Sequence, residues 1–154
     1  INLEMVTYIT KGNIFKLAGV HAYAHGCNCA GAMGRGIAVQ FKERYPEMYR
    51  EYLRRCKVGE FCPGDVYLYQ NGIEPVFNLG TEKHWRLGAE LSFVEQSLTG
   101  MVELAKAHHI DRIALPRIAA GLGKLDWEEV KTVINRVAGD EAEVELLVVE
   151  EYEP

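Results

Sequence analysis

Two glycine-rich segments are the parts of this sequence best suited to hold an anion. The first is residues 25–36 (HGCNCAGAMGRG) and the second is residues 116–123 (PRIAAGLG). Because glycine has no Cβ atom, backbone N–H groups can approach a phosphate closely, and the start of a following helix adds the positive end of its dipole. One such segment alone is more often a plain tight turn. Two of them, each expected between a strand and a helix, predict a diphosphate site.

The two best-known nucleotide-binding motifs are incomplete in these segments. The dinucleotide fingerprint needs a third glycine where Val39 stands. A P-loop ending in Gly123-Lys124 needs Ser or Thr as its next residue to hold magnesium, and Leu125 stands there instead. We therefore predict neither ordinary NAD binding nor ATP hydrolysis.

A metal site is a second chemistry that the residue types suggest. His25, Cys27 and Cys29 offer at most three ligands, and Cys56 and Cys62 do not complete a zinc pattern with them. Alternate residues of one strand share a face, so Cys27 and Cys29 are expected to pack around the first glycine-rich segment. We predict no metal site, and free thiols rather than disulfides, because four cysteines are too few for a disulfide scaffold.

The elements that must position these residues can be read from hydrophobic periodicity. Strands are expected at residues 6–9, 21–26, 66–69, 76–79, 112–116 and 143–149, and helices at 37–45, 47–55, 91–108 and 127–137. Strands that alternate with helices need crossover connections, which predict a largely parallel sheet covered on both faces, an α/β/α sandwich. Ligands bind such sheets beyond the carboxyl ends of the strands.

Two local signals sharpen these expectations. Asn71-Gly72 separates two β-rich runs and predicts a hairpin with a tight turn, because Asn-Gly readily adopts positive φ angles. Asp126 and Glu129 resemble a capping box and predict a helix start at Trp127.

Length and composition limit the classes of protein. The chain has 154 residues, 48% of them hydrophobic and 25% charged, which fits one globular domain rather than a disordered chain. No apolar run reaches the roughly 18 residues that span a bilayer, and no secretory signal is visible, so a cytoplasmic protein without membrane contact is expected. The start at Ile1 indicates that residues 1–4 are a vector remnant, which leaves residues 5–154 as the domain.

The net charge of −5 argues against a protein that holds nucleic acid by bulk neutralisation of phosphates. The last fifteen residues carry seven negative charges and no positive one, so residues 1–139 have 17 positive and 15 negative side chains. Residues 35–57 are locally basic, with seven positive and three negative side chains. Such runs are usually solvated helix faces, but contact with an anionic ligand remains open.

Several motifs together resemble the macrodomain family, which binds ADP-ribose. They are Lys11-Gly12-Asn13-Ile14 after a strand, Asn28 ahead of Gly34-Arg-Gly-Ile-Ala38, and the second glycine-rich segment before Leu125-Asp-Trp-Glu128. The resemblance runs from Met5 to about Val149 and implies a three-layer α/β/α sandwich with a mixed, largely parallel sheet. The second segment is most similar to the branch that contains terminal ADP-ribose glycohydrolase and the DarG group of antitoxins.

The resemblance implies an ADP-ribose site with no further cofactor. Adenine would lie at Asn13 and Ile14, where the family commonly has Asp at the first position, and the distal ribose would lie at Asn28. The implied contacts are Asn13, Ile14, Asn28, Gly34, Arg35, Gly36, Ile37, Ala38, Pro116, Arg117, Ile118, Ala119, Ala120, Gly121, Leu122 and Gly123.

The resemblance also implies that Lys83 is catalytic, whereas a lysine in such a polar loop is usually only solvated. A protonated Lys83 could stabilise negative charge on a departing base nitrogen. A nucleophilic Lys83 would need burial or a cationic neighbour such as His84 or Arg86 to lose its proton. The related glycohydrolase has a catalytic Asp where this chain has Gly123, which puts a mechanism that needs that carboxylate in doubt.

The first functional hypothesis is a DNA ADP-ribosyl glycohydrolase that removes ADP-ribose from thymine in single-stranded DNA, as an antitoxin. Trp85, if exposed, could stack a nucleobase, although half-buried packing is at least as common. The alternatives are a non-catalytic ADP-ribose reader, or a hydrolase of ADP-ribosylated acidic side chains or of small ADP-ribose esters or phosphates. A DarT-like toxin would bind through a region outside this chain, and a monomer is expected.

Overall fold

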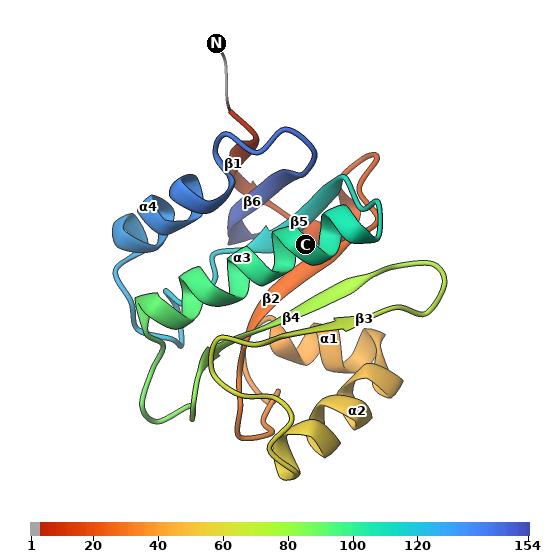
Figure 1. Cartoon of the computed structure of the whole chain (residues 1–154), viewed down its shortest axis with the longest axis vertical. Coiled ribbons are helices and arrows are strands. Elements are labelled where there is room, and N and C mark those ends of the chain that lie inside the picture. Colours follow the sequence, from red (N-terminus) through yellow and green to blue (C-terminus); the bar gives the residue numbers. More distant parts are fainter. Residues whose placement is uncertain (1–3) are drawn as a thin grey trace.

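A six-stranded sheet between two layers of helices forms the frame of the molecule (Figure 1). This computed structural model describes residues 4–154. The strands are β1 Val6–Gly12, β2 Tyr23–Asn28, β3 Val66–Tyr69, β4 Val76–Glu82, β5 Arg112–Pro116 and β6 Glu145–Tyr152. The helices are η1 Ile14–Lys16, α1 Ala38–Arg44, α2 Pro46–Lys57, α3 Leu91–Ala107 and α4 Trp127–Ala138. Each predicted strand and helix is present; β3 and β5 have the predicted bounds, and the ends of the others are shifted. Residues 1–3 of the predicted vector remnant lie outside the described residues.

The sheet is mixed and largely parallel, as predicted. Its strand order is β1-β6-β5-β2-β4-β3, and every pairing is parallel except that of β3 with β4. β1 continues to Gly12 because it pairs with β6 as far as Tyr152. The polar residues Thr10 and Lys11 hid this extension, since they are exposed on an edge strand.

The hairpin between β3 and β4 exists, but the predicted tight turn is wrong. The strands end at Tyr69 and resume at Val76, so a longer loop joins them. Pro75 has no N–H to donate to a strand ladder, which delays the start of β4. Gly72 has a φ of 86°, and Asn71 Oδ1 instead accepts the N–H groups of Ile73 and Glu74 at 2.9 and 2.8 Å.

The predicted capping box at α4 is also wrong in its side-chain part. Asp126 is the N-cap residue with extended backbone, but its side chain makes no capping hydrogen bond. Glu128 and Glu129 still place negative charge at the positive end of the helix dipole. The residue types therefore mark where the helix starts, while the surroundings decide which way the Asp126 side chain points.

Alternate residues of the central strands supply two cores. Ala24 of β2 and Ala22 just before it face α3 and α4, in a cluster with Phe77 and Leu98. Tyr23 faces α1 and α2 on the other side of the sheet. Both faces are thus covered, and α3 crosses in front of the sheet in Figure 1. The carboxyl ends of the strands are left to bind a ligand. Within residues 4–154, no helix has the length and apolar character that crossing a membrane requires.

Candidate functional site

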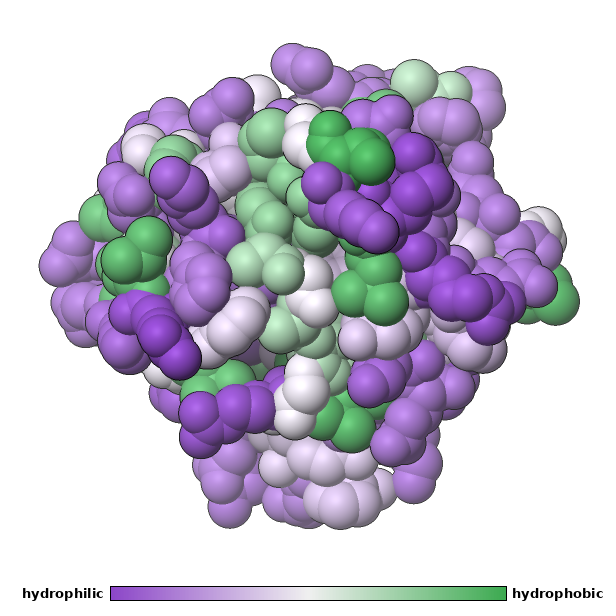
Figure 2. All heavy atoms as spheres, turned by 90° about the horizontal axis from the view of Figure 1, so that it is seen from below, coloured by the Kyte–Doolittle hydropathy of each residue, from purple (hydrophilic) through white to green (hydrophobic). Residues whose placement is uncertain are grey.

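A cleft of about 590 Å³ lies at the carboxyl ends of β2, β4 and β5. Both glycine-rich segments line it, one after β2 and one after β5. Figure 2 views the molecule from below and shows a hollowed band of white and pale green residues between hydrophilic surfaces. The cleft has the size of a typical small-molecule site, which is about 300–1,000 Å³.

The cleft brings most of the predicted ADP-ribose contacts together. Those that line it are Asn28, Gly34, Arg35, Gly36, Ile37, Ala38, Pro116, Arg117, Ile118, Ala119, Gly121, Leu122 and Gly123. Ile14 lines an adjoining hollow of about 180 Å³, which shares Ile37 and Arg117 with the cleft. Asn13 and Ala120 are in neither lining, and Asn13 Oδ1 instead accepts the Phe15 N–H at 2.9 Å. The binding role of all these residues stays a prediction.

Asn28 organises the first glycine-rich segment from the end of β2. Its Oδ1 accepts the N–H groups of Ala30 and Ala32 at 3.0 and 3.2 Å, and its Nδ2 donates to the Ala32 oxygen at 2.8 Å. The hydroxyl of Tyr52, which is fully buried in α2, donates to the backbone oxygen of Asn28 at 2.8 Å. Nδ2 carries a second hydrogen, which a ligand hydroxyl could accept.

The second glycine-rich segment forms a compact turn that demands glycine at one position. A Cβ atom at Gly123 would lie 2.5 Å from the Ala119 oxygen, so no side chain fits there without a backbone shift. Ala119 has a φ of 63°, a strained value for a residue with a Cβ atom. Gly121 lies in open space, with no atom within 4 Å of an added Cβ.

A break in strand register accompanies two consecutive residues of β4 that both line the cleft. Cys27 pairs with Gly80 and Asn28 with Glu82, so Thr81 has no partner on β2. In a regular strand successive side chains point to opposite faces, but here Thr81 and Glu82 both line the cleft.

Glu82 is an acidic group with unusual surroundings. It is 8% exposed, and its Oε2 atom is buried without a hydrogen-bond partner among the residues that the structure describes. Burial raises the pKa of this carboxyl, and the positive charge of Lys124 partly opposes the shift. Sequence reasoning missed Glu82, although it directly precedes Lys83 at the end of a buried strand.

Lys83 lies outside the cleft lining, and its side chain is exposed. Its neighbour Trp85 lines the cleft, is 44% exposed, and stacks on His84 with ring centroids 3.8 Å apart. The backbone N–H of Arg86 donates to His84 Nδ1 at 3.1 Å. The structure therefore brings Trp85 and Arg86 to the cleft but leaves Lys83 at the surface.

Positive charge dominates the cleft in spite of the overall charge of −5. Arg35, Arg86, Arg117 and Lys124 line it, against the single acidic residue Glu82. Sequence reasoning did not place the following lining residues among the contacts: Gly26, Cys27, Ala32, Met33, Thr81, Glu82, Trp85, Arg86 and Lys124. Most lie within or next to a glycine-rich segment or at the end of a buried strand, and that position is the signal that could have found them.

His25 is a buried structural residue of β2. It is 0% exposed, stacks on Phe41 at 3.9 Å, and its Nε2 lies 2.7 Å from Asn78 Oδ1, which can only accept the hydrogen bond. Burial lowers its pKa to about 4, so the ring is neutral at pH 7. Cys27 Sγ lies 3.5 Å from the same ring. Residues 4–154 contain no group of three His, Cys, Asp or Glu side chains placed to hold a metal ion.

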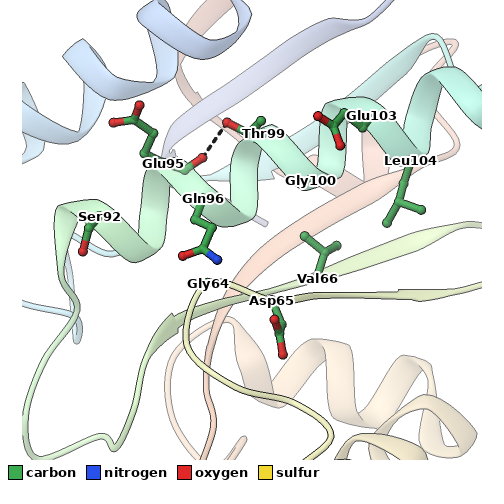
Figure 3. Close-up of a pocket in the computed structure, with 10 residues that line it drawn as sticks. All are labelled: Gly64, Asp65, Val66, Ser92, Glu95, Gln96, Thr99, Gly100, Glu103 and Leu104. Carbon is green, nitrogen blue, oxygen red and sulfur yellow. Dashed lines mark hydrogen bonds between the residues drawn. The ribbon is translucent and has the colours of Figure 1, made fainter.

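A separate groove of about 810 Å³, the acidic groove, lies between the start of β3 and α3 (Figure 3). Asp65, Glu95 and Glu103 line it, and the rest of its lining is polar, small or aliphatic, with no cationic residue. Such a groove repels an anion, whereas the cleft at the strand ends attracts one.

Comparisons with known proteins agree on the family. The sequence pattern of the Macro domain family matches residues 24–134. The DNA ADP-ribosyl glycohydrolase of Thermus aquaticus is 36% identical over 148 residues, which cover 94% of this chain and 40% of the relative. That of Mycobacterium tuberculosis is 36% identical over 131 residues, which cover 82% of this chain and 37% of the relative.

Solved structures lead to the same family. The macrodomain of Thermus aquaticus DarG superposes with a TM-score of 0.84 and 34% identity, covering 98% of this chain and 99% of that one. The chain spans about two fifths of the length of the curated glycohydrolases that it matches. The chain belongs to the Macro domain family.

Proposed function

We propose that this chain is an ADP-ribosyl glycohydrolase that releases ADP-ribose from thymine in single-stranded DNA. The observation that carries the proposal is the positively charged cleft between two glycine-rich segments, in a family member 36% identical to DNA ADP-ribosyl glycohydrolases. An antitoxin role, and a DarT-like toxin as partner of a longer protein, follow from the same likeness. The reaction needs water and no cofactor.

The cleft and the adjoining hollow beside Ile14 suggest how ADP-ribose lies. Adenine occupies the smaller one beside Ile14, and the diphosphate lies between residues 34–38 and 119–123, facing Arg35. The distal ribose then reaches Asn28 and the end of β4. This order leaves the C1″ atom, where the thymine is attached, on the side of Glu82 and Trp85.

Exposed apolar side chains beside the cleft support a nucleic-acid substrate. Trp85, Leu87 and Leu122 are 44%, 70% and 51% exposed, and Trp85 and Leu122 line the cleft. An exposed indole can stack on a base, a contact worth about 1–3 kcal/mol, and the nearby Arg86 can bind a phosphate. The proposed contact with DNA covers only a few nucleotides, because little positive charge lies outside the cleft to bind further phosphates.

Lys83 remains a proposed catalytic residue. With Gly123 in place of a carboxylate, nothing at that position can take the proton from the lysine. Because no such base is present there, we favour a protonated Lys83 that stabilises the departing base over a nucleophilic Lys83.

The decisive experiment offers the purified chain three substrates side by side. They are single-stranded DNA carrying ADP-ribosyl-thymine, a protein carrying ADP-ribosyl-glutamate, and ADP-ribose 1″-phosphate, with release of ADP-ribose or phosphate as the readout. Fastest turnover of the DNA supports the proposal. Preference for either other substrate, or tight binding without turnover, identifies the alternative hydrolase or the ADP-ribose reader.

A further inference from the structure

We propose that Glu82 is the acid that donates a proton to the departing base in this reaction. The inference rests on the proposed glycohydrolase function and adds a catalytic residue to it. Its basis is Glu82, a residue that lines the cleft and is 8% exposed, and whose Oε2 atom is buried without a hydrogen-bond partner in residues 4–154. Buried polar atoms are nearly always hydrogen-bonded, so an unpaired one in a ligand cleft points to a function.

The register break in the sheet explains how Glu82 comes to face the cleft. Thr81 is the extra residue of β4 opposite Cys27 and Asn28. In a strand with unbroken register, Thr81 and Glu82 would point to opposite faces of the sheet. Such bulges often lie beside active sites, where they redirect a side chain. Backbone bonds fix the residue, because the Cys29 N–H donates to the Glu82 oxygen at 2.9 Å and Glu82 bridges to Ala89.

The groups around Glu82 shift its carboxyl towards the protonated form. Burial raises its pKa, and Lys124, which directly follows the second glycine-rich segment, opposes this shift without reversing it. Cys27 on β2 and Cys29 just after it stay uncharged, because burial raises the pKa of both thiols. The other charged groups of the cleft are arginines, of which Arg35 and Arg86 come from the flanking loops.

The chemistry balances with one carboxyl and one water molecule. The bond between C1″ and the base nitrogen breaks, its electron pair goes to the nitrogen, and the nitrogen takes the proton of Glu82. Water adds its oxygen to C1″ and passes a proton to the Glu82 carboxylate. The products are ADP-ribose and unmodified thymine in the DNA, and the acid is ready for another turnover.

The test compares Glu82→Gln with Glu103→Gln, the same change at an exposed residue of the acidic groove. Single-turnover release of ADP-ribose from modified single-stranded DNA should fall about 100-fold or more in Glu82→Gln, the size expected for a lost acid, and stay unchanged in Glu103→Gln. Calorimetry should give ADP-ribose affinities within about threefold of each other, because Gln keeps the size and shape of the Glu side chain.

A second substrate separates an acid from a structural residue. When ADP-ribose is joined through C1″ to 4-nitrophenolate, the leaving group needs no proton, so Glu82→Gln should retain most of the wild-type rate. The wild-type rate on DNA should fall with rising pH as Glu82 loses its proton, and the variant should lack this limb.

Three results would overturn the assignment. Wild-type turnover of DNA by Glu82→Gln, or equal losses on both substrates, removes Glu82 as the acid and leaves the proposed function standing. A wild-type chain that binds ADP-ribose but turns over neither substrate removes both proposals.

Discussion

The hydroxyl of Tyr52 in α2 lies 2.8 Å from the backbone oxygen of Asn28 and 3.0 Å from its side-chain oxygen, which ties the helix to the end of β2. The same hydroxyl accepts the Ala32 N–H at 3.1 Å. One buried side chain therefore holds the first glycine-rich segment at both ends of its initial turn. Neither residue type signals this contact, because the partners are 24 positions apart.

Tyr52→Phe should loosen that segment. Loss of the hydroxyl leaves buried polar groups with fewer partners, so we expect a free energy of unfolding lower by about 1–2 kcal/mol and weaker ADP-ribose binding. Urea denaturation and calorimetry measure the two effects. Tyr49→Phe, on the same helix, is the control. Equal ADP-ribose affinity in the two variants would show that Tyr52 serves stability alone.

Gly121→Glu should abolish ADP-ribose binding and leave the fold intact. An added Cβ at Gly121 meets no atom within 4 Å, so the carboxylate can enter the predicted diphosphate site and repel the ligand. Gly123→Ala should instead destabilise the protein, because its Cβ would lie 2.5 Å from the Ala119 oxygen. Calorimetry and thermal melting distinguish the two changes. A folded Gly121→Glu protein with wild-type affinity would refute the placement of the diphosphate.

Lys83→Ala should separate binding from turnover. The side chain is exposed and outside the cleft lining, so ADP-ribose affinity should persist, while release from modified DNA falls by about two orders of magnitude. Lys57→Ala, at the end of α2, is the control. Full activity would make Lys83 a surface residue. A borohydride-trapped adduct on Lys83, seen by mass spectrometry, would favour the nucleophile over the protonated lysine.

His25 should make the protein sensitive to mild acid. Its folded-state pKa of about 4 lies below the unfolded value of about 6.5, so its contribution is complete above pH 6.5 and is lost as the pH falls towards 4. The loss amounts to about 3 kcal/mol at pH 4.5. Urea denaturation at pH 7 and 4.5 measures it, and His25→Gln should show a smaller pH effect. Equal pH effects in both proteins would assign acid sensitivity to other groups.

The sequence by itself determined the order of strands and helices and the two segments that line the cleft. Residue periodicity and glycine content are local properties of the sequence, so they can be read without knowing how distant segments pack. The buried run of β5 and the stripe of α3 are examples, since both follow from spacing alone. The three-layer architecture also followed, because alternating strands and helices leave few other ways to bury their apolar faces.

The tertiary structure decided which side chains face the ligand. Glu82 and Lys83 are adjacent in the sequence, yet one is buried in the cleft and the other is exposed. That difference comes from the pairing of β4 with β2, where Thr81 breaks the register. The partners lie more than fifty residues apart, and a shift of one residue turns a side chain to the other face. Local patterns carry no information on such a shift, so only the assembled sheet could place Glu82 in the site.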